Sequence, residues 1–534
     1  MSRMHHALLR AVALCALIQL AVDPALGFQG NQYFAAQHGD PDDPDQPPAG
    51  EDYISQILKR LDEQDAEIQR LKQPQALPAP AMTDDQEREA RQDYGADIGP
   101  RTAISQLQSR FEEFQKGLGK KAYPTVEVHG VAQMDSGWFG QDAASVASLK
   151  SAANPTGVID NGSDFRRTRL SANGALTENM NYFVQMDFAF PGRPTFTDVW
   201  MEVTKLPIIG NVRAGQWKMP FSLEVVSSFR YTTFPERSVL FQSFDPFRHI
   251  GFGFYNTTED EMMTWSAAAY RPGQDQFGDA LSYGNTGNYA GVGRITGLAW
   301  YENEGTRYLH LGAGYNYVAP QAAAGTNVRT SSFNTIPEYF IGQNQTTTAG
   351  TAGVSQPNTI IDGTPKFVNT KNFAVNHYNL VGWELLLVEG PLSVQSEFMI
   401  LNATRANSVA ADFGGFYTTV GYFLTGEHRP YLKKSGAIDR IKPFHNFIKS
   451  PAGNEGDEEC CGLGAWELAV RWSYIDLNAH DIQGGRLNDL TVGLNWYLNA
   501  YAKVQFNYIR AMLDNPTFND SVTDIFGLRA QFDF

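Results

Sequence analysis

The chain has 534 residues, of which 12% are aromatic and 19% are charged, and its formal net charge is −16 at pH 7. So acidic a chain is unsuited to general nucleic-acid binding, because contacts to phosphate groups need a basic surface. Its mean hydropathy of −0.33 combines a polar average with many aromatic residues, which favours two half-wet faces over one large dry core.

The N-terminal region reads as a targeting segment followed by a spacer. Residues 1–27 place arginines before a short apolar stretch and end in small residues, which predicts a secretory signal peptide. Residues 28–50 are rich in Pro and Asp and predict a disordered linker. The remaining cysteines, Cys460 and Cys461, are adjacent; we expect a vicinal disulfide or two plain thiols there, and no metal site.

Two heptad segments follow the spacer. Residues 51–73 repeat apolar residues such as Ile54 and Leu61 at heptad spacing, which predicts a coiled coil. Residues 74–100 form a Pro-rich and charged linker, and residues 101–120 form a second heptad helix. We expect a trimeric coiled coil on the periplasmic side that contacts the cell wall. Amphipathic helices that pack on a domain are the alternative.

From residue 121 to 534 the apolar period changes to two. In LTVGLNWYL, for example, Leu490 and Val492 fall on one face of a strand and Thr491 falls on the other. A soluble sandwich would turn the apolar faces inward, whereas a transmembrane barrel turns them toward lipid. Aromatic residues near the strand ends, and polar residues all along the strands, favour the barrel.

The barrel region accommodates about 16 strands, at roughly 25 residues per strand and connection. The predicted fold is therefore all-β: a 16-stranded antiparallel transmembrane β-barrel over 121–534, preceded by a short α-helical coiled-coil region. Long stretches without alternation, above all 321–372, are expected to be extracellular loops. The last strand places Phe534 on its apolar face, where we expect a C-terminal signal for the barrel assembly machinery.

Seven segments of the barrel region, in the same order, resemble the phosphate-selective porin O and P family. They are DFRRTRLSANGAL (164–176), VRAGQWKMPFSLEVVSS (212–228), PERS (235–238), GYFLTGEHRPY (421–431), IKP (441–443), GAWELAVRWSYIDL (464–477) and LTVGLNWYLN (490–499). The resemblance implies a 16-stranded homotrimeric porin of a Gram-negative outer membrane, with a loop folded inward to narrow the pore.

The resemblance also implies an anion path. It places the constriction loop at about 218–249 and matches Arg166 and Arg167 to adjacent arginines that contact translocating anions. The planar guanidinium fork suits phosphate because it offers paired donors. The candidate anion-path residues are Arg166, Arg167, Arg169, Arg213, Lys218, Arg230, Arg237 and Arg248. The alternative for such residues is that they brace the loop through ion pairs with Glu224 or Glu236.

Arg166 and Val225 both depart from the pattern that such a path implies. Arg166 lies on the opposite strand parity to Arg167, so it reaches the pore only at a bulge or before the strand begins. Val225 stands where the family's phosphate-selective members place a lysine. We therefore expect moderate anion preference, with weak discrimination between phosphate and chloride.

The predicted function is passive diffusion of small anions, phosphate among them, or of polar solutes. The sequence has no GxSxG, no HExxH and no phosphate-cradling glycine loop, so we expect neither an enzyme nor a cofactor. The alternatives are an envelope-tethering protein, with the barrel as anchor for the coiled coil, and a surface adhesin that uses the long loops. The expected partners are two further copies of the chain, outer-membrane lipid, the assembly machinery, the cell wall and small anions.

Overall fold

The computed structural model describes residues 123–534 except 151–153, 190–193, 208, 273–288, 321, 323–327, 343–363, 407, 448–461 and 516–519. The predicted signal peptide, linkers and heptad helices, and the pair Cys460–Cys461, lie outside the described residues. Among the residues that are described, no helix is long and apolar enough to cross a membrane.

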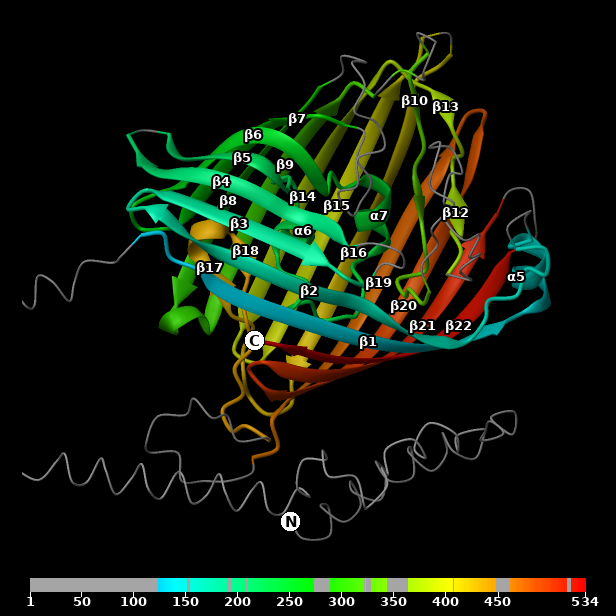
Figure 1. Cartoon of the computed structure of the whole chain (residues 1–534). Coiled ribbons are helices and arrows are strands. Elements are labelled where there is room, and N and C mark those ends of the chain that lie inside the picture. Colours follow the sequence, from blue (N-terminus) through cyan, green and yellow to red (C-terminus); the bar gives the residue numbers. More distant parts are fainter. Residues whose placement is uncertain are drawn as a thin grey trace, which may run out of the picture. The chain divides into compact units, whose positions relative to one another are not determined.

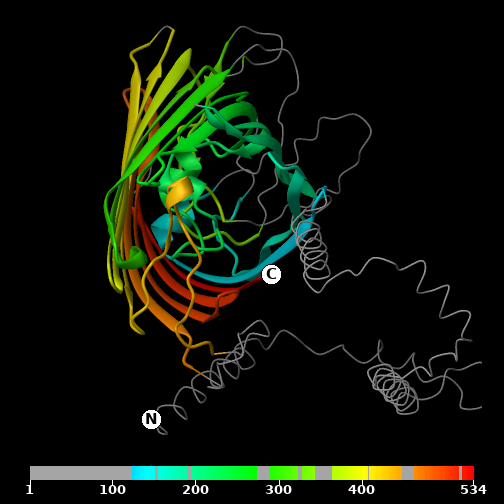
Figure 2. The ribbon, with the colours of Figure 1, turned by 90° about the vertical axis from the view of Figure 1, so that its left-hand side faces the viewer.

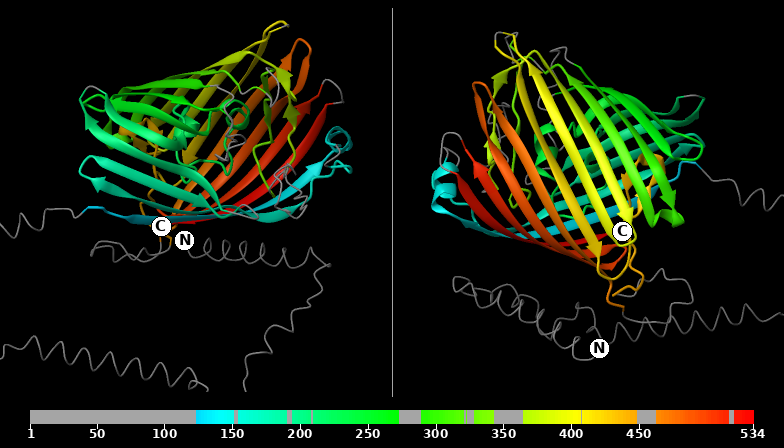
Figure 3. Two further views of the ribbon diagram at one scale, coloured as in Figure 1. Left: turned by 45° about the horizontal axis from the view of Figure 1, so that its top comes forward. Right: turned by 180° about the vertical axis from the view of Figure 1, so that it is seen from behind.

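Sixteen antiparallel strands close into a barrel, in chain order (Figures 1 and 3). They are β1 (Glu127–Gln141), β2 (Gly162–Thr177), β3 (Met180–Asp187), β4 (Thr195–Leu206), β5 (Gly210–Lys218), β6 (Arg248–Thr257), β7 (Met263–Tyr270), β8 (Ala290–Glu302), β9 (Arg307–Val318), β14 (His377–Glu389), β15 (Leu392–Thr404), β16 (Ala411–Phe423), β19 (Ala465–Ala479), β20 (Ile482–Asn499), β21 (Ala502–Asp514) and β22 (Ser521–Asp533). The last strand pairs with the first, from Val131–Asp533 to Gln141–Thr523. The predicted 16-stranded barrel is confirmed.

The two faces of the strands have opposite character, as the period of two predicts. On β19, Trp472 is 51% exposed on the outside, whereas its neighbours Arg471 and Ser473 are 2% and 0% exposed. On β22, Phe532 is exposed and Arg529 is fully buried. Apolar side chains therefore cover the outer wall, and polar and charged side chains line the interior, as lipid outside and a polar lumen require.

The barrel wall is low on one side. Strands β3 and β7 contain 8 residues each, whereas β20, on the opposite part of the sheet order, contains 18. At about 3.3 Å per residue and a tilt near 45°, eight residues cover only about 19 Å of membrane thickness.

A first inward loop, residues 219–247, joins β5 to β6 and runs inside the barrel (Figure 2). It contains two short helices, α6 (Leu223–Val226) and α7 (Val239–Phe244). Asn495 of β20 and Gln505 of β21 donate hydrogen bonds of 2.7 and 2.9 Å to the carbonyl of Thr233. The loop therefore crosses the lumen to the opposite wall, as the family resemblance implied.

A second inward loop joins β9 to β14, and its longer described parts are 328–342 and 364–376. They include the short paired strands β10 (Thr330–Ser331) and β13 (Phe373–Ala374), and β11 (Asn334–Thr335) and β12 (Val368–Asn369). These parts fold into the lumen, which the prediction of 321–372 as an extracellular loop did not include; the side of the membrane on which the loop begins stays a prediction. Tyr339 donates to the carbonyls of Ser136 and Leu528 on the barrel wall. Its apolar residues, such as Ile341, are buried against lumen-facing Ile525.

A third inward loop, residues 424–447, enters from the end of the barrel that carries Phe534. It contains β17 (Tyr431–Leu432), the 3₁₀ turn η2 (Lys433–Ser435) and β18 (Ala437–Ile438). Arg440 donates to the carbonyl of Ala500 and to Asp533, and Arg294 of β8 donates to the carbonyl of Gly436 at 2.8 Å. Loops therefore fill the lumen from both ends. The remaining short elements, α5 (Ala143–Ser148) and η1 (Asn303–Gly305), lie between strands.

Phe534 continues the seam between the first and last strands. Its backbone N–H and carbonyl both pair with Gly130 at 3.1 Å, and its ring is 63% exposed on the outer wall. Its recognition by assembly machinery stays a prediction.

Candidate functional site

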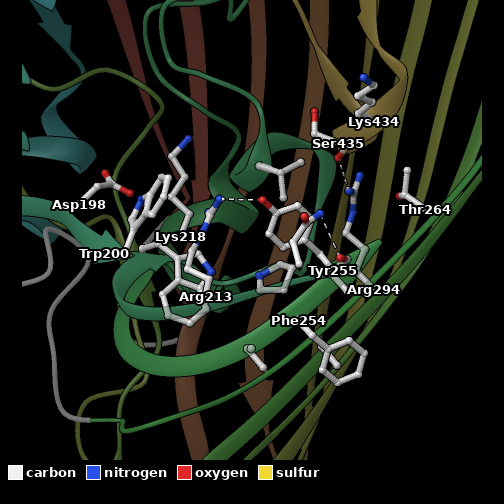
Figure 4. Close-up of a pocket in the computed structure, with 18 of the residues that line it drawn as sticks. Asp198, Trp200, Arg213, Lys218, Phe254, Tyr255, Thr264, Arg294, Lys434 and Ser435 are labelled. Atoms are coloured by element: carbon white, nitrogen blue, oxygen red, sulfur yellow. Dashed lines mark hydrogen bonds between the residues drawn. The ribbon is translucent and has the colours of Figure 1, made fainter. Parts of the chain in front are cut away.

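The lumen contains a cavity of about 640 Å³ beside the low wall. Strands β3 to β8 line it from the wall, the first inward loop from within, and the third inward loop contributes Lys434 and Ser435. Its charged lining residues are Arg213, Lys218, Arg230, Arg248, Arg294, Lys434 and Asp198. Six cations thus face one carboxylate among the described residues. In Figure 4, Asp198, Lys218 and Arg213 lie on one side of the view, with Arg294 and Lys434 on the other.

Arg213 is held on the wall by aromatic rings and one carboxylate. Its guanidinium carbon lies 3.9 Å from the ring centre of Trp200 and 5.1 Å from that of Tyr255. Glu202 accepts from its Nε at 3.1 Å and from its Nη2 at 2.7 Å. The Arg213 side chain is still 22% exposed, because this pairing covers only one edge of the guanidinium.

Lys218 and Arg248 lie directly opposite each other on β5 and β6. Like charges at such positions destabilise a sheet, and here Asp198 is the nearby partner, accepting from Arg248 Nε at 2.8 Å. Lys218 donates to the carbonyl of Ser227 at 2.9 Å, which leaves two of its three donors for other acceptors.

Three further cations complete the lining. Arg230, in the first inward loop, lies 3.8 Å from Asp533 and is 20% exposed. Arg294 is buried and donates hydrogen bonds to Glu384 and to the third inward loop. Lys434 is 78% exposed and lies 3.5 Å from Glu261. Lys218, Arg213, Arg230 and Lys434 are thus the cations most accessible to a solute.

The other four predicted residues, Arg166, Arg167, Arg169 and Arg237, line a second cavity of only about 10 Å³, room for a single water molecule at most. Phe229 lines both cavities. The guanidinium carbons of Arg167 and Arg169 lie 5.0 and 4.6 Å from its ring centre. Phe229 therefore stands between this four-arginine cluster and the larger cavity.

A bulge brings Arg166 and Arg167 to the same face. Gln133 of β1 pairs with Arg167, and the next residue, Met134, pairs with Phe165, so the register skips Arg166. Both side chains consequently turn inward and are buried. This meets the condition under which the sequence allowed Arg166 to reach the lumen.

Glu236, in the first inward loop, is the hub of this cluster. Its carboxylate accepts from Arg166 at 2.8 Å and from Arg529 of β22 at 2.9 Å, and Arg167 lies 3.5 Å away. Burial alone would raise the pKa of Glu236, but the charges of these arginines overcome that effect and hold the pKa well below its ordinary value. Glu236 therefore stays ionised and ties the loop to both sides of the seam.

Arg237 and Val225 have structural roles inside the first inward loop. Arg237 donates to the carbonyls of Glu224 at 2.6 Å and Ser227 at 3.0 Å, so it braces the loop through backbone carbonyls rather than through the ion pairs that the alternative named. Burial lowers the pKa of Arg237 to about 10, so it remains charged at neutral pH. Val225 is fully buried beside Phe241, so a lysine at this position in this chain would be buried in an apolar cluster.

Sequence reasoning missed the aromatic residues of the cavity and the third inward loop. Trp200 shares strand parity with Glu202, so a large ring on the polar face of a strand was an available signal. Lys434 reaches the cavity through the fold of the third loop, which no strand pattern indicates. Arg294 lies on the inward face of β8, so its strand parity was an available signal. Within the described ranges, no group of three His, Cys, Asp or Glu residues is placed to hold a metal ion.

Comparison with known proteins identifies one family and several similar chains. A family model described as phosphate-selective porin O and P matches residues 146–534. The chain is similar to Porin O of Pseudomonas aeruginosa, with 23% identity over 393 residues that cover 69% of this chain and 82% of that protein. It is also similar to an uncharacterised protein of Caulobacter vibrioides, with 25% identity over 403 residues that cover 71% of each. Among solved structures, the anion-selective porin from Comamonas acidovorans aligns with a TM-score of 0.46 and 9% identity, over 76% of this chain and 99% of that one.

Proposed function

Because the chain belongs to the phosphate-selective porin O and P family, we propose that this outer-membrane porin passes small anions, phosphate among them, through the cavity beside its low wall. The observation that carries the proposal is the charge of the lining, six cations against the single carboxylate of Asp198 among the described residues. This excess stands out in a chain whose net charge is −16.

The physical basis is the field inside a narrow, low-dielectric wall. A fixed positive charge there lowers the energy of an entering anion and raises that of a cation. Arg213 and Lys218 keep donors available to a passing solute, since their protein partners use only some of them. Weak, repeated contacts of this kind favour entry without trapping the ion.

The four-arginine cluster, on the far side of Phe229 from the larger cavity, also favours anions. Arg166, Arg167 and Arg169 share two carboxylates, Glu236 and Asp187, and Phe229 separates them from the larger cavity. We propose that they contribute field rather than direct contacts, so that the direct anion path runs along Arg213, Lys218 and Arg230.

The low wall supports a homotrimer. Strands β3, β5 and β7, of 8, 9 and 8 residues, are too short to meet the full height of the lipid core. Two neighbouring copies of the chain would cover this wall better than lipid does. Trimers that resist detergent on a gel, and dissociate on heating, would support this assembly.

The deciding experiment is the reversal potential of single channels in asymmetric salt. We expect anion preference for the natural protein and a shift toward zero for Lys218→Gln, which removes one cation of the opposed pair. Lys205→Gln is the charge-matched control, because Lys205 is 69% exposed near the end of β4; its reversal potential should match that of the natural protein. A natural channel that prefers cations would overturn the proposal.

A further inference from the structure

Four consecutive strands each contribute one side chain to a continuous stack on the cavity wall. They are Phe183 of β3, Trp200 of β4, Arg213 of β5 and Tyr255 of β6, which we call the aromatic ladder. The rings of Phe183 and Trp200 are stacked, with centres 5.6 Å apart and planes within 9°. Arg213 covers the same indole at 3.9 Å and faces Tyr255 on its other side. Figure 4 shows Arg213 between the Trp200 and Tyr255 side chains, with a hydrogen bond to the Tyr255 hydroxyl.

The ladder fixes Arg213 but leaves part of its guanidinium open. Tyr255 donates to Glu202 at 2.6 Å and accepts from Arg213 Nη2 at 3.3 Å, so three side chains lock one another in place. Arg213 Nη1 donates to no described residue. A ligand in the cavity therefore meets one unused guanidinium edge and the edges of the neighbouring rings, which carry partial positive charge.

A second cation near the ladder, Arg248, pairs with Asp198 through its Nε but has one guanidinium nitrogen without an acceptor in the described part of the chain. The side chain of Arg248 is 2% exposed, and its Nη1 has no hydrogen-bond partner among the described residues. Arg248 lines the same cavity and lies across from Lys218. A buried guanidinium N–H without an acceptor costs free energy, and the carboxylate of a ligand would satisfy it.

Much of the remaining lining is apolar. Trp217, Pro220, Val226 and Phe229 line the cavity together with the ladder. A cavity of about 640 Å³ falls in the range of sites for organic molecules. Inorganic phosphate would leave this apolar surface against water, whereas an aromatic ring would cover it.

We propose that the cavity binds aromatic monocarboxylates during passage, with the carboxylate at Arg213, Lys218 and Arg248 and the ring against the ladder. The inference rests on the proposed function, because it needs the cavity to lie on the path of anions. It adds the solute class that the aromatic lining selects.

The test measures how organic anions block the chloride current of the full-length channel in planar bilayers. We expect benzoate to reach half-block at a concentration about five-fold lower than acetate, which has the same charge without the ring. Cyclohexanecarboxylate should fall between them, because it supplies apolar contact without ring electrostatics. In Trp200→Leu and Phe183→Leu the difference between benzoate and acetate should shrink below about two-fold.

The matched control is Trp383→Leu. Trp383 stacks on Phe398 at 5.6 Å and 23°, much as Trp200 does on Phe183, but it is 47% exposed on the outer wall. This variant should keep the full preference for benzoate. Equal block by benzoate and acetate in an anion-selective channel, or stronger block by phosphate than by benzoate, would overturn this inference and leave the proposed function standing. Cation selectivity would overturn the proposed function itself.

Discussion

The two sides of the lumen use the same charged residue types to different ends. On the side of β19 to β22, buried Arg471 lies 2.6 Å from Glu338, and Arg529 lies 2.5 Å from Asp135 and 2.9 Å from Glu236. On the side of β3 to β8, six cations share a cavity with one lining carboxylate among the described residues. Five of these six cations also have a carboxylate within 4 Å. The sides therefore differ in exposure: the pairs of Arg471 and Arg529 are fully buried, whereas Arg213, Arg230 and Lys434 keep part of their side chains open to the cavity.

The two arrangements also differ in the free energy that is lost when one charged partner is removed. On the paired side, removing one partner leaves a buried charge uncompensated, which costs several kcal/mol. On the cavity side, Arg213 and Lys434 are partly exposed, and water and ions screen them. Variants on the paired side should therefore change stability, and variants on the cavity side should change selectivity.

The largest effect is expected for Glu236→Gln. This change leaves Arg166, Arg167 and Arg529 without a shared anion in a buried site, so we expect a loss of about 3–5 kcal/mol of folding free energy. The measurement is the denaturant or temperature midpoint of the detergent-solubilised barrel. The control is Glu389→Gln, whose 52% exposed carboxylate pairs with Arg307 and should change stability by about 1 kcal/mol or less. Equal midpoints for both variants would break the comparison.

Asp198→Asn should increase the anion preference of the channel. The change removes the lining carboxylate but keeps an acceptor for Arg248. One unit charge at close range is worth about 1 kcal/mol even in water, so the anion-to-cation permeability ratio should rise about five-fold. Reversal potentials measure this ratio. Glu178→Gln, at an 83% exposed turn position, is the matched control, and a fall in the ratio for Asp198→Asn would contradict the assignment of the cavity as the path.

Phe229→Ala should connect the two cavities. Without this ring, the four-arginine cluster loses its cover and faces the larger cavity, so we expect about a two-fold increase in anion preference and higher conductance. Phe398→Ala, on the outer wall at 43% exposure, serves as the control for loss of an aromatic ring. An unchanged selectivity would show that the cluster acts on the lumen only through the fold.

The smallest effect is expected from salt alone. Raising the ionic strength from about 0.1 M to 1 M shortens the Debye length from about 10 Å to 3 Å. The selectivity of the natural channel should therefore weaken, while the stability of the buried pairs should change little. Bilayer recordings at the two salt concentrations measure the selectivity, and thermal midpoints measure the stability. A midpoint that drops steeply with salt would show that the paired side is exposed to solvent.

The sequence predicted the features that depend only on the order of residues within one strand, such as which face each side chain occupies. The alternation that turns Trp472 outward and Arg471 inward is a local pattern, and lipid on one side enforces it. All eight predicted cations line one of the two cavities, because strand parity and the inward loop place them there. Their division between the cavities was not predictable, since Phe229 separates them only after the loop has folded.

Other features arise from contacts between distant parts of the chain. Glu236 meets Arg166 across 70 residues and Arg529 across 293 residues, which no local pattern encodes. The aromatic ladder forms by stacking across strands, so its members look unremarkable within their own segments. The inward path of 328–342 was missed because its apolar residues follow no regular period.

The contacts of Arg529 bear on how the barrel assembles in the membrane. It joins β22 to β1 through Asp135 and to the first inward loop through the Pro235 carbonyl and Glu236. We therefore expect the seam to close and the loop to lodge in a single event during insertion. No wide-open intermediate would then precede the finished channel, and the envelope would keep its permeability barrier while each new copy enters the membrane.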